Sequence, residues 1–225
     1  MACLSSGPCC ARVPRQSYSS ARANCARECK CFAPHLKNEM PNPNRVVLDV
    51  AMSSDAALLA NLLELYLHDL SEVFPIELKA DGRFGYDKLP LYWSEPARRF
   101  PFLIKYGTRI VGFVLVTRGS PASDDPEVFD IAEFFVLRRY RRSGVGRRAA
   151  FMVWDRLPGR WTVRVSEGNI KALPFWERVI AEYTNGVPTE FMRPGSPSAW
   201  RVFTFISSPT TARRHGGRTS LPSRR

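Results

Sequence analysis

EFFVLRRYRRSGVGRRAA, residues 133–150, is the stretch of sequence that decides the fold. Its apolar start, from Phe134 to Leu137, predicts a buried strand, and the apolar spacing from Val145 onward predicts a helix. Two glycines and six arginines surround the turn between them. The arginines are Arg138, Arg139, Arg141, Arg142, Arg147 and Arg148.

This turn has the chemistry of a phosphate-binding site. The first backbone N–H groups of a helix have no partner within the helix, and the helix dipole places partial positive charge there. Glycine lets the backbone approach a phosphate closely, and arginine adds forked donors. The spacing fits neither GxxxxGK[ST] nor GxGxxG followed by an acidic residue, which argues against a P-loop and a Rossmann site. We therefore expect a pyrophosphate site of another kind.

The positive charge of the chain is concentrated at its ends. The net charge is +12, but residues 1–45 and 207–225 each carry +5, which leaves +2 for residues 46–206. A nearly neutral middle makes nucleic acid an unfavoured main ligand. One alternative stays open, in which the terminal segments and the arginine cluster bind nucleic acid or an anionic surface.

We expect both ends of the chain to lie outside the folded domain. Residues 1–44 hold all six cysteines, and the CxxxCxC spacing at 25–31 lacks the paired knuckles of structural zinc sites. This predicts a disordered leader without metal, and we hypothesise that the folded protein needs only the chain from Met40 onward. The polar, basic residues 207–225 predict a disordered tail. A middle without cysteine or a long apolar run predicts a cytoplasmic protein with no membrane partner.

Apolar periodicity predicts an α+β fold, with a mixed sheet covered by helices, for residues 45–206. Strands are expected at 45–51, on both sides of Gly107 within 100–118, and at 128–138, 160–166, 189–193 and 200–207. Helices are expected at about 55–73, 145–157 and 169–182, with a short helix within 75–100. Because Pro174 is costly inside a helix, the last helix should begin later than Asn169 or bend there.

Two motifs resemble those of the GNAT superfamily of N-acetyltransferases. The stretch at 133–150 is similar to its acetyl-CoA signature, [QR]xxGx[GA] after a strand, and NIKALPFWERVI (169–180) is similar to its NxxAxxFY helix. The resemblance covers roughly residues 46–206. It implies a single domain with a mostly antiparallel central sheet, in which the strand that carries the coenzyme splays from its neighbour and forms a cleft.

The resemblance also implies which residues bind acetyl-CoA, the expected co-substrate. The backbone of Phe135, Val136 and Leu137 would pair with the pantetheine arm, and an amide near Val136 would stabilise the oxyanion. Asn169 would touch the pantetheine or position a water. The pyrophosphate would be held by Arg141, Arg142, Ser143, Gly144, Val145 and Gly146, with Arg147 at the start of the helix. Arg138, Arg139 or Arg148 could reach the 3′-phosphate.

Glu133 is the leading candidate for the general base. A carboxylate on the central strand could take a proton from the amine through water. The alternative is a structural ion pair in an arginine-rich protein. Simple alternation places Glu133 on the same face as Ile131 and opposite Asp130, unless a bulge redirects the strand, and Asp130 is the second choice.

One position departs from the family pattern. Trp176 stands where the family often has a tyrosine that protonates the leaving thiolate, and indole is not a general acid at neutral pH. Tyr183 lies two turns further on, too far to replace it, and Tyr140 is expected to pack. The thiolate would then be protonated by another group or leave unassisted.

The resemblance implies that the protein is an N-acetyltransferase that acts on a primary amine of an unidentified small molecule or peptide. A non-catalytic acyl-CoA-binding domain on the same fold is the alternative. Acceptor recognition is expected from residues 70–100, 119–126 and 184–200, whose acids and aromatics favour a cationic amine. Either a monomer or a homodimer is compatible with the sequence.

Overall fold

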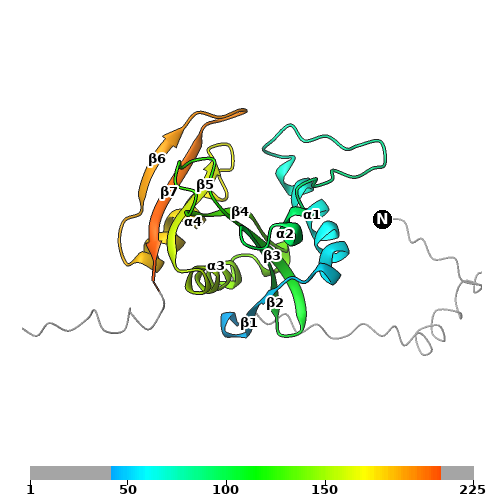
Figure 1. The fold of residues 1–225 in the computed structure, drawn as a ribbon, viewed down its shortest axis with the longest axis horizontal. Helices are drawn as coiled ribbons and strands as arrows, with labels where there is room; N and C mark the ends of the chain where they lie inside the picture. The colour runs from blue at the N-terminus through cyan, green and yellow to red at the C-terminus, as the bar shows by residue number, and fades with distance from the viewer. Residues whose placement is uncertain (1–41, 209–225) are drawn as a thin grey trace, which may run out of the picture. The chain divides into compact units, whose positions relative to one another are not determined.

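The computed structural model describes residues 42–208, which are built around a seven-stranded sheet (Figure 1). The strand order is β1-β2-β3-β4-β5-β7-β6, and every neighbouring pair is antiparallel except β4 and β5. The strands are β1 (Val46–Val50), β2 (Arg99–Tyr106), β3 (Arg109–Arg118), β4 (Phe129–Val136), β5 (Gly159–Ser166), β6 (Thr189–Arg193) and β7 (Trp200–Ser207). This confirms the expected mixed, mostly antiparallel sheet with the apolar strand β4 at its centre.

Helices cover both faces of this sheet. The helices are α1 (Ala56–Leu70), α2 (Leu91–Ser94), α3 (Val145–Arg156) and α4 (Leu173–Thr184). One apolar core joins α1 and α2 to residues such as Phe113 and Leu115, and the other joins α3 and α4 to Val114 and Val116. These four residues alternate along β3, so the period of the strand separates the two cores. Within residues 42–208, no helix is both long and apolar enough to cross a membrane.

The element boundaries follow local chemistry. Helix α4 begins at Leu173 with Pro174 in its first turn, the only part of a helix that tolerates proline well, as the sequence indicated. The expected leader reaches less far than residue 44, because Pro43–Arg45 is a 3-10 helix and the Asn42 N–H donates to Tyr106 Oη at 2.9 Å. The remaining leader, including its cysteines, and the tail beyond residue 208 lie outside the described residues.

Strands β4 and β5 are paired only where they start. Their shared ladder has two positions, Phe129 with Trp161 and Asp130 with Thr162. Beyond this point β4 stays paired with β3 up to Val136, and β5 stays paired with β7 along its whole length. The two halves of the sheet therefore diverge (Figure 1), and the β5-facing edge of β4 has no strand partner after Asp130 within the described chain.

A bulge in β4 changes which side chains share a face. Leu115 is opposite Glu133 but Val116 is opposite Ile131, so Ala132 is an extra residue in the strand. Simple alternation, which grouped Glu133 with Ile131, is therefore wrong here. Ile131 belongs to the core beneath α3 and α4, whereas Asp130 and Glu133 both line a pocket on the other face. A β-bulge of this kind redirects side chains locally.

Candidate functional site

The turn before α3 has the geometry of an anion site. Gly144 precedes the helix with φ 80°, and Arg142 also has a left-handed φ of 61°. The first hydrogen bond of the helix runs from the Arg148 N–H to the Gly144 carbonyl at 2.9 Å. The N–H groups of the first turn therefore have no acceptor in the helix and carry its partial positive charge. Ser143 closes the turn, since its Oγ donates to the Tyr140 carbonyl at 2.8 Å.

The two sequence motifs meet in space at this turn. A Cβ at Gly146 would lie 3.3 Å from Cζ of Phe175 in the first turns of α4, and Phe134 packs against both Phe175 and Trp176, with ring centroids 6.0 and 5.0 Å apart. Asn169 lies in the turn before α4, where its Oδ1 accepts the Ala172 N–H at 3.2 Å.

Asp69, at the end of α1, neutralises part of the arginine cluster. Arg138 Nη2 and Arg141 Nη2 each lie 2.5 Å from one of its carboxylate oxygens. Burial acts to raise the pKa of Asp69, but the hydrogen bonds and charges of the two arginines outweigh it, and the pKa lies below its ordinary value. Arg147 pairs with Glu182. Sequence reasoning missed Asp69, because only the fold brings the end of α1 to this turn.

The other three arginines of the cluster are unengaged. Within residues 42–208, the side chains of Arg139, Arg142 and Arg148 make no ion pair or hydrogen bond. They are therefore the cluster's uncompensated charges, next to the exposed N–H groups of α3.

Of the residues Phe135, Val136 and Leu137, Val136 alone directs its backbone N–H and carbonyl toward the open edge of β4. The Leu137 N–H donates to the Val111 carbonyl of β3 at 2.8 Å. Because N–H groups alternate in direction along a strand, Phe135 also faces β3, and Val136 faces the open edge. The Val136 carbonyl accepts from Arg141 Nε at 2.6 Å. Val136 is therefore the residue of this stretch whose backbone faces the open edge, and coenzyme binding by the three residues stays a prediction.

Glu133 is held by two tyrosines, one from α1 and one from the α1–β2 segment that lines the pocket. Tyr66 of α1 donates its hydroxyl to Oε2 at 2.7 Å, and Tyr86 donates to Oε1 at 3.0 Å. Burial raises the pKa of Glu133 above its ordinary value, although both hydroxyls and the charge of Arg164 act against this. The pKa values of both tyrosines are also raised, first by burial and then by the Glu133 charge, so they remain donors. Sequence reasoning identified neither tyrosine as a partner.

Asp130, the second candidate, is the carboxylate that forms the ion pair. Its side chain is fully buried, and Arg164 Nη2 lies 2.7 Å from its Oδ2. Thr162 Oγ1 donates to Oδ1 at 2.8 Å. Asp130 lies opposite Thr162 at the last paired position of β4 and β5, and the Arg164 guanidinium contacts both of its carboxylate oxygens. Glu133 has no such cationic partner at ion-pair distance within residues 42–208, so it is the better candidate for proton transfer.

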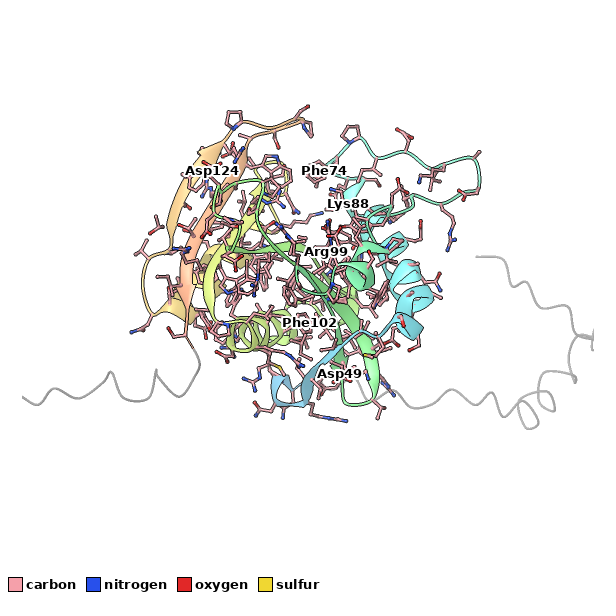
Figure 2. The ribbon with its side chains drawn as sticks, viewed as in Figure 1. Asp49, Phe74, Lys88, Arg99, Phe102 and Asp124 are labelled. Carbon is pink, nitrogen blue, oxygen red and sulfur yellow. The ribbon has the colours of Figure 1, made fainter. Side chains whose placement is uncertain are left out.

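A pocket of about 660 Å³ opens over these two carboxylates. Its wall is formed by the α1–β2 segment, the end of β3, the β3–β4 loop, the start of β4 and Arg164 of β5. In Figure 2, Lys88 and Arg99 lie near the middle of the view, and Asp124 of the β3–β4 loop lies to the upper left. The acceptor segments expected at 70–100 and 119–126 both contribute to this wall, whereas 184–200 does not.

The aromatic residues considered as proton donors pack away from this pocket. Trp176 is 6% exposed and packs edge-to-face against Phe134 in the core beneath α3 and α4. Tyr183 donates to Asp155 Oδ1 at 3.0 Å, and Tyr140 packs against Tyr106 with ring centroids 5.8 Å apart. The expectations for Tyr183 and Tyr140 agree with these positions.

Comparison with known families identifies the fold. The model of the acetyltransferase (GNAT) family matches residues 59–180. The chain belongs to this family. Its fold is similar to that of an acetyltransferase from Thermus thermophilus, with 20% identity, a TM-score of 0.52, and coverage of 72% of this chain and 96% of that one. A search of curated proteins gave no match.

Two further GNAT-like structures were determined with a coenzyme. One is spermidine N-acetyltransferase from Vibrio cholerae in complex with CoA and spermine, at 13% identity and a TM-score of 0.51, covering 73% of this chain and 96% of that one. The other is yncA from Salmonella typhimurium with its cofactor acetyl-CoA, at 11% identity and a TM-score of 0.52, covering 73% and 95%. At these identities the likeness concerns the fold.

Replacing Gly144 with alanine tests the turn before α3. A left-handed φ costs a residue with a Cβ about 1–2 kcal/mol, and the added Cβ would lie 2.8 Å from Pro43 Cγ. We expect a lower free energy of unfolding in urea and weaker acetyl-CoA binding by calorimetry. Gly82→Ala is the control, because Gly82 has φ 75° but open space around it. Equal effects of the two substitutions on acetyl-CoA binding would contradict a role of the turn before α3 in binding the coenzyme.

Replacing Glu133 with glutamine tests the raised pKa through stability. A carboxyl whose pKa is higher in the folded protein stabilises fully below its unfolded pKa, and this contribution is lost as pH rises through the folded pKa. Glutamine has no proton to lose, so the Tm of Glu133→Gln minus that of the wild type should increase from about pH 5 to about pH 8. Glu177→Gln, at an exposed position of α4, is the control substitution. A difference that stays constant or falls for Glu133→Gln would contradict the raised pKa.

Proposed function

We propose that the protein is an N-acetyltransferase that transfers the acetyl group of acetyl-CoA to a primary amine by direct attack. The observation that carries this proposal is the position of Glu133. It lies in the pocket, without an ion-pair partner in the described chain, on the strand whose open edge leads to the turn before α3. The family and the coenzyme-bound structures of similar fold support acetyl-CoA as the co-substrate.

The coenzyme would bind along β4 and end at α3. The pantetheine would run beside Phe135, Val136 and Leu137, with Val136 supplying the backbone partners, and Asn169 would lie on its other side. The pyrophosphate would be held by the turn Arg141, Arg142, Ser143, Gly144, Val145 and Gly146 and by Arg147. Because Arg138 and Arg141 are paired with Asp69, Arg139 and Arg148 are the better candidates for the 3′-phosphate.

The chemistry requires a neutral amine and a stabilised oxyanion. Glu133 would take one proton from the bound ammonium, directly or through a water, and its raised pKa suits this role near neutral pH. The amine nitrogen would then form a bond to the thioester carbonyl carbon, while the Val136 N–H donates to the developing oxyanion. Collapse would break the C–S bond, and the thiolate would leave with the proton that the amide nitrogen loses, so none is needed from the buried Trp176.

Removing the Glu133 carboxylate tests the proposal against a non-catalytic binding domain. For Glu133→Gln we expect kcat to fall about 10²–10⁴-fold, the usual contribution of a general base, with acetyl-CoA affinity retained in calorimetry. In the wild type, kcat should decline with falling pH at a value above the ordinary carboxyl range. Glu177→Gln serves as the control. Acetyl-CoA binding with no turnover of any amine by the wild type would favour the binding domain instead.

Replacing Trp176 with phenylalanine tests whether this position takes part in proton transfer. Trp176 packs between Phe134 and Phe175 and lies in a core with Trp154. We expect a lower Tm, because the smaller ring leaves a cavity, while kcat measured well below that Tm stays within about tenfold of wild type. A drop in kcat of about a thousandfold, the size of a general-acid effect, would contradict this prediction and indicate that Trp176 takes part in proton transfer.

A further inference from the structure

The wall of the acceptor pocket carries more positive than negative side chains. Five basic and four acidic residues line it. They are Lys88, Arg98, Arg99, Arg118 and Arg164, and Glu95, Asp125, Asp130 and Glu133. Some of these side chains already have an ion-pair partner within the fold. The charge of a suitable ligand depends on the side chains that do not.

Most of these charges have partners. The pairs are Arg99–Glu95 at 2.8 Å, Arg164–Asp130 at 2.7 Å, Arg118–Glu127 at 2.9 Å and Arg160–Asp125 at 2.5 Å. Three charged residues of the wall are left, namely Lys88, Arg98 and Glu133. Within residues 42–208, the side chains of Lys88 and Arg98 form no ion pair or hydrogen bond, whereas Glu133 is bound by two hydroxyls.

Lys88 and Arg98 line the same pocket as the candidate base and are carried by ordered backbone. Lys88 follows Tyr86, the residue whose hydroxyl binds Glu133, by two positions, and its charge acts on Glu133. The carbonyl of Arg98 accepts the Arg118 N–H at 2.7 Å, which fixes it at the end of β3. The pocket thus presents two cations around one carboxylate.

These cations are not needed for the coenzyme phosphates. The pocket uses β4 from Asp130 to Glu133, whereas the turn before α3 follows Val136. Glu133, the pocket residue of β4 nearest to this turn, precedes Val136 by three residues of strand, which is about 10 Å. The phosphate-binding turn has its own free arginines, so Lys88 and Arg98 lie on the acceptor side.

We infer that the acetyl acceptor is a small amine that also carries an anionic group, a carboxylate or a phosphate, which Lys88 and Arg98 bind while the amine faces Glu133. This rests on the proposed function and narrows its substrate class. A polyamine would place additional positive charge beside two unpaired cations, which is unfavourable in a partly enclosed pocket. The sequence favoured a cationic amine because of the acids and aromatics of these segments, and the inferred acceptor carries an anionic group in addition to its amine.

Matched pairs of amines test the inference in the full-length protein. An α-amino acid and its primary amide differ mainly in one negative charge, and so do phosphoethanolamine and ethanolamine in their phosphate. Spermidine serves as the polycation. We would measure binding to the coenzyme A-loaded protein by calorimetry and acetylation by release of free thiol. In the wild type, the anionic member of at least one pair should bind more tightly and react faster, and the pair that does so identifies carboxylate or phosphate.

Two variants locate the effect. Lys88→Gln and Arg98→Gln should each reduce the preference for the anionic member about ten- to a hundredfold, the effect of losing a charge-assisted hydrogen bond. Acetyl-CoA affinity and Tm should be unchanged. Arg83→Gln is the matched control, since Arg83 is exposed in the same segment but does not line the pocket.

The outcomes separate this inference from the proposed function. Equal binding of both members of every pair, a preference for spermidine, or an unaltered preference in both variants overturns the inference while the acetyltransferase proposal stands. Failure of the wild type to bind acetyl-CoA overturns the proposed function itself, and the inference with it.

Discussion

The short pairing of β4 with β5 is the constraint on which the rest of the structure depends. The two strands share two ladder positions, and Asp130, which is fully buried and paired with Arg164, lies at the last of them. A longer ladder would occupy the edge of β4 with β5 backbone, and no extended ligand could pair there. Because the divergence begins beside Asp130, the open edge, the pocket and Glu133 all lie within one strand length of each other.

The two carboxylates on this face have different environments and therefore different chemistry. Asp130 is matched by a guanidinium and a hydroxyl, which stabilise its charge where it is fully buried. Within residues 42–208, Glu133 receives only neutral hydroxyl donors, from Tyr66 and Tyr86, and burial outweighs them. A bulge of one residue places both side chains on the same side of the sheet. The fold thus keeps one carboxylate as a structural anchor and leaves the other able to exchange a proton.

Local chemistry explains how much the sequence could predict. The glycine turn before α3, the delayed start of α4 at Pro174 and the central strand each depend on neighbouring residues, so their signals are in the sequence itself. The partners of Glu133, and Asp69 as the shared partner of Arg138 and Arg141, come from α1 and from the irregular segment that carries Tyr86, which lack any periodic relation to β4. The sequence allowed for a bulge in this strand but could not place it at Ala132, because an apolar strand shows no break in its pattern where one residue is inserted.

The turn that contains Tyr86 and Lys88 links two tasks that are separate in many enzymes. Its backbone is closed by a hydrogen bond from the Leu89 N–H to the Tyr86 carbonyl at 3.0 Å, which fixes the main chain of the two residues relative to each other. Under the proposed chemistry, an acceptor that engages Lys88 also steadies the hydroxyl that orients Glu133. With an acceptor that lacks the anionic group, this hydroxyl and Glu133 would be less constrained. Selectivity for the anionic acceptor would therefore appear in kcat as well as in the binding affinity.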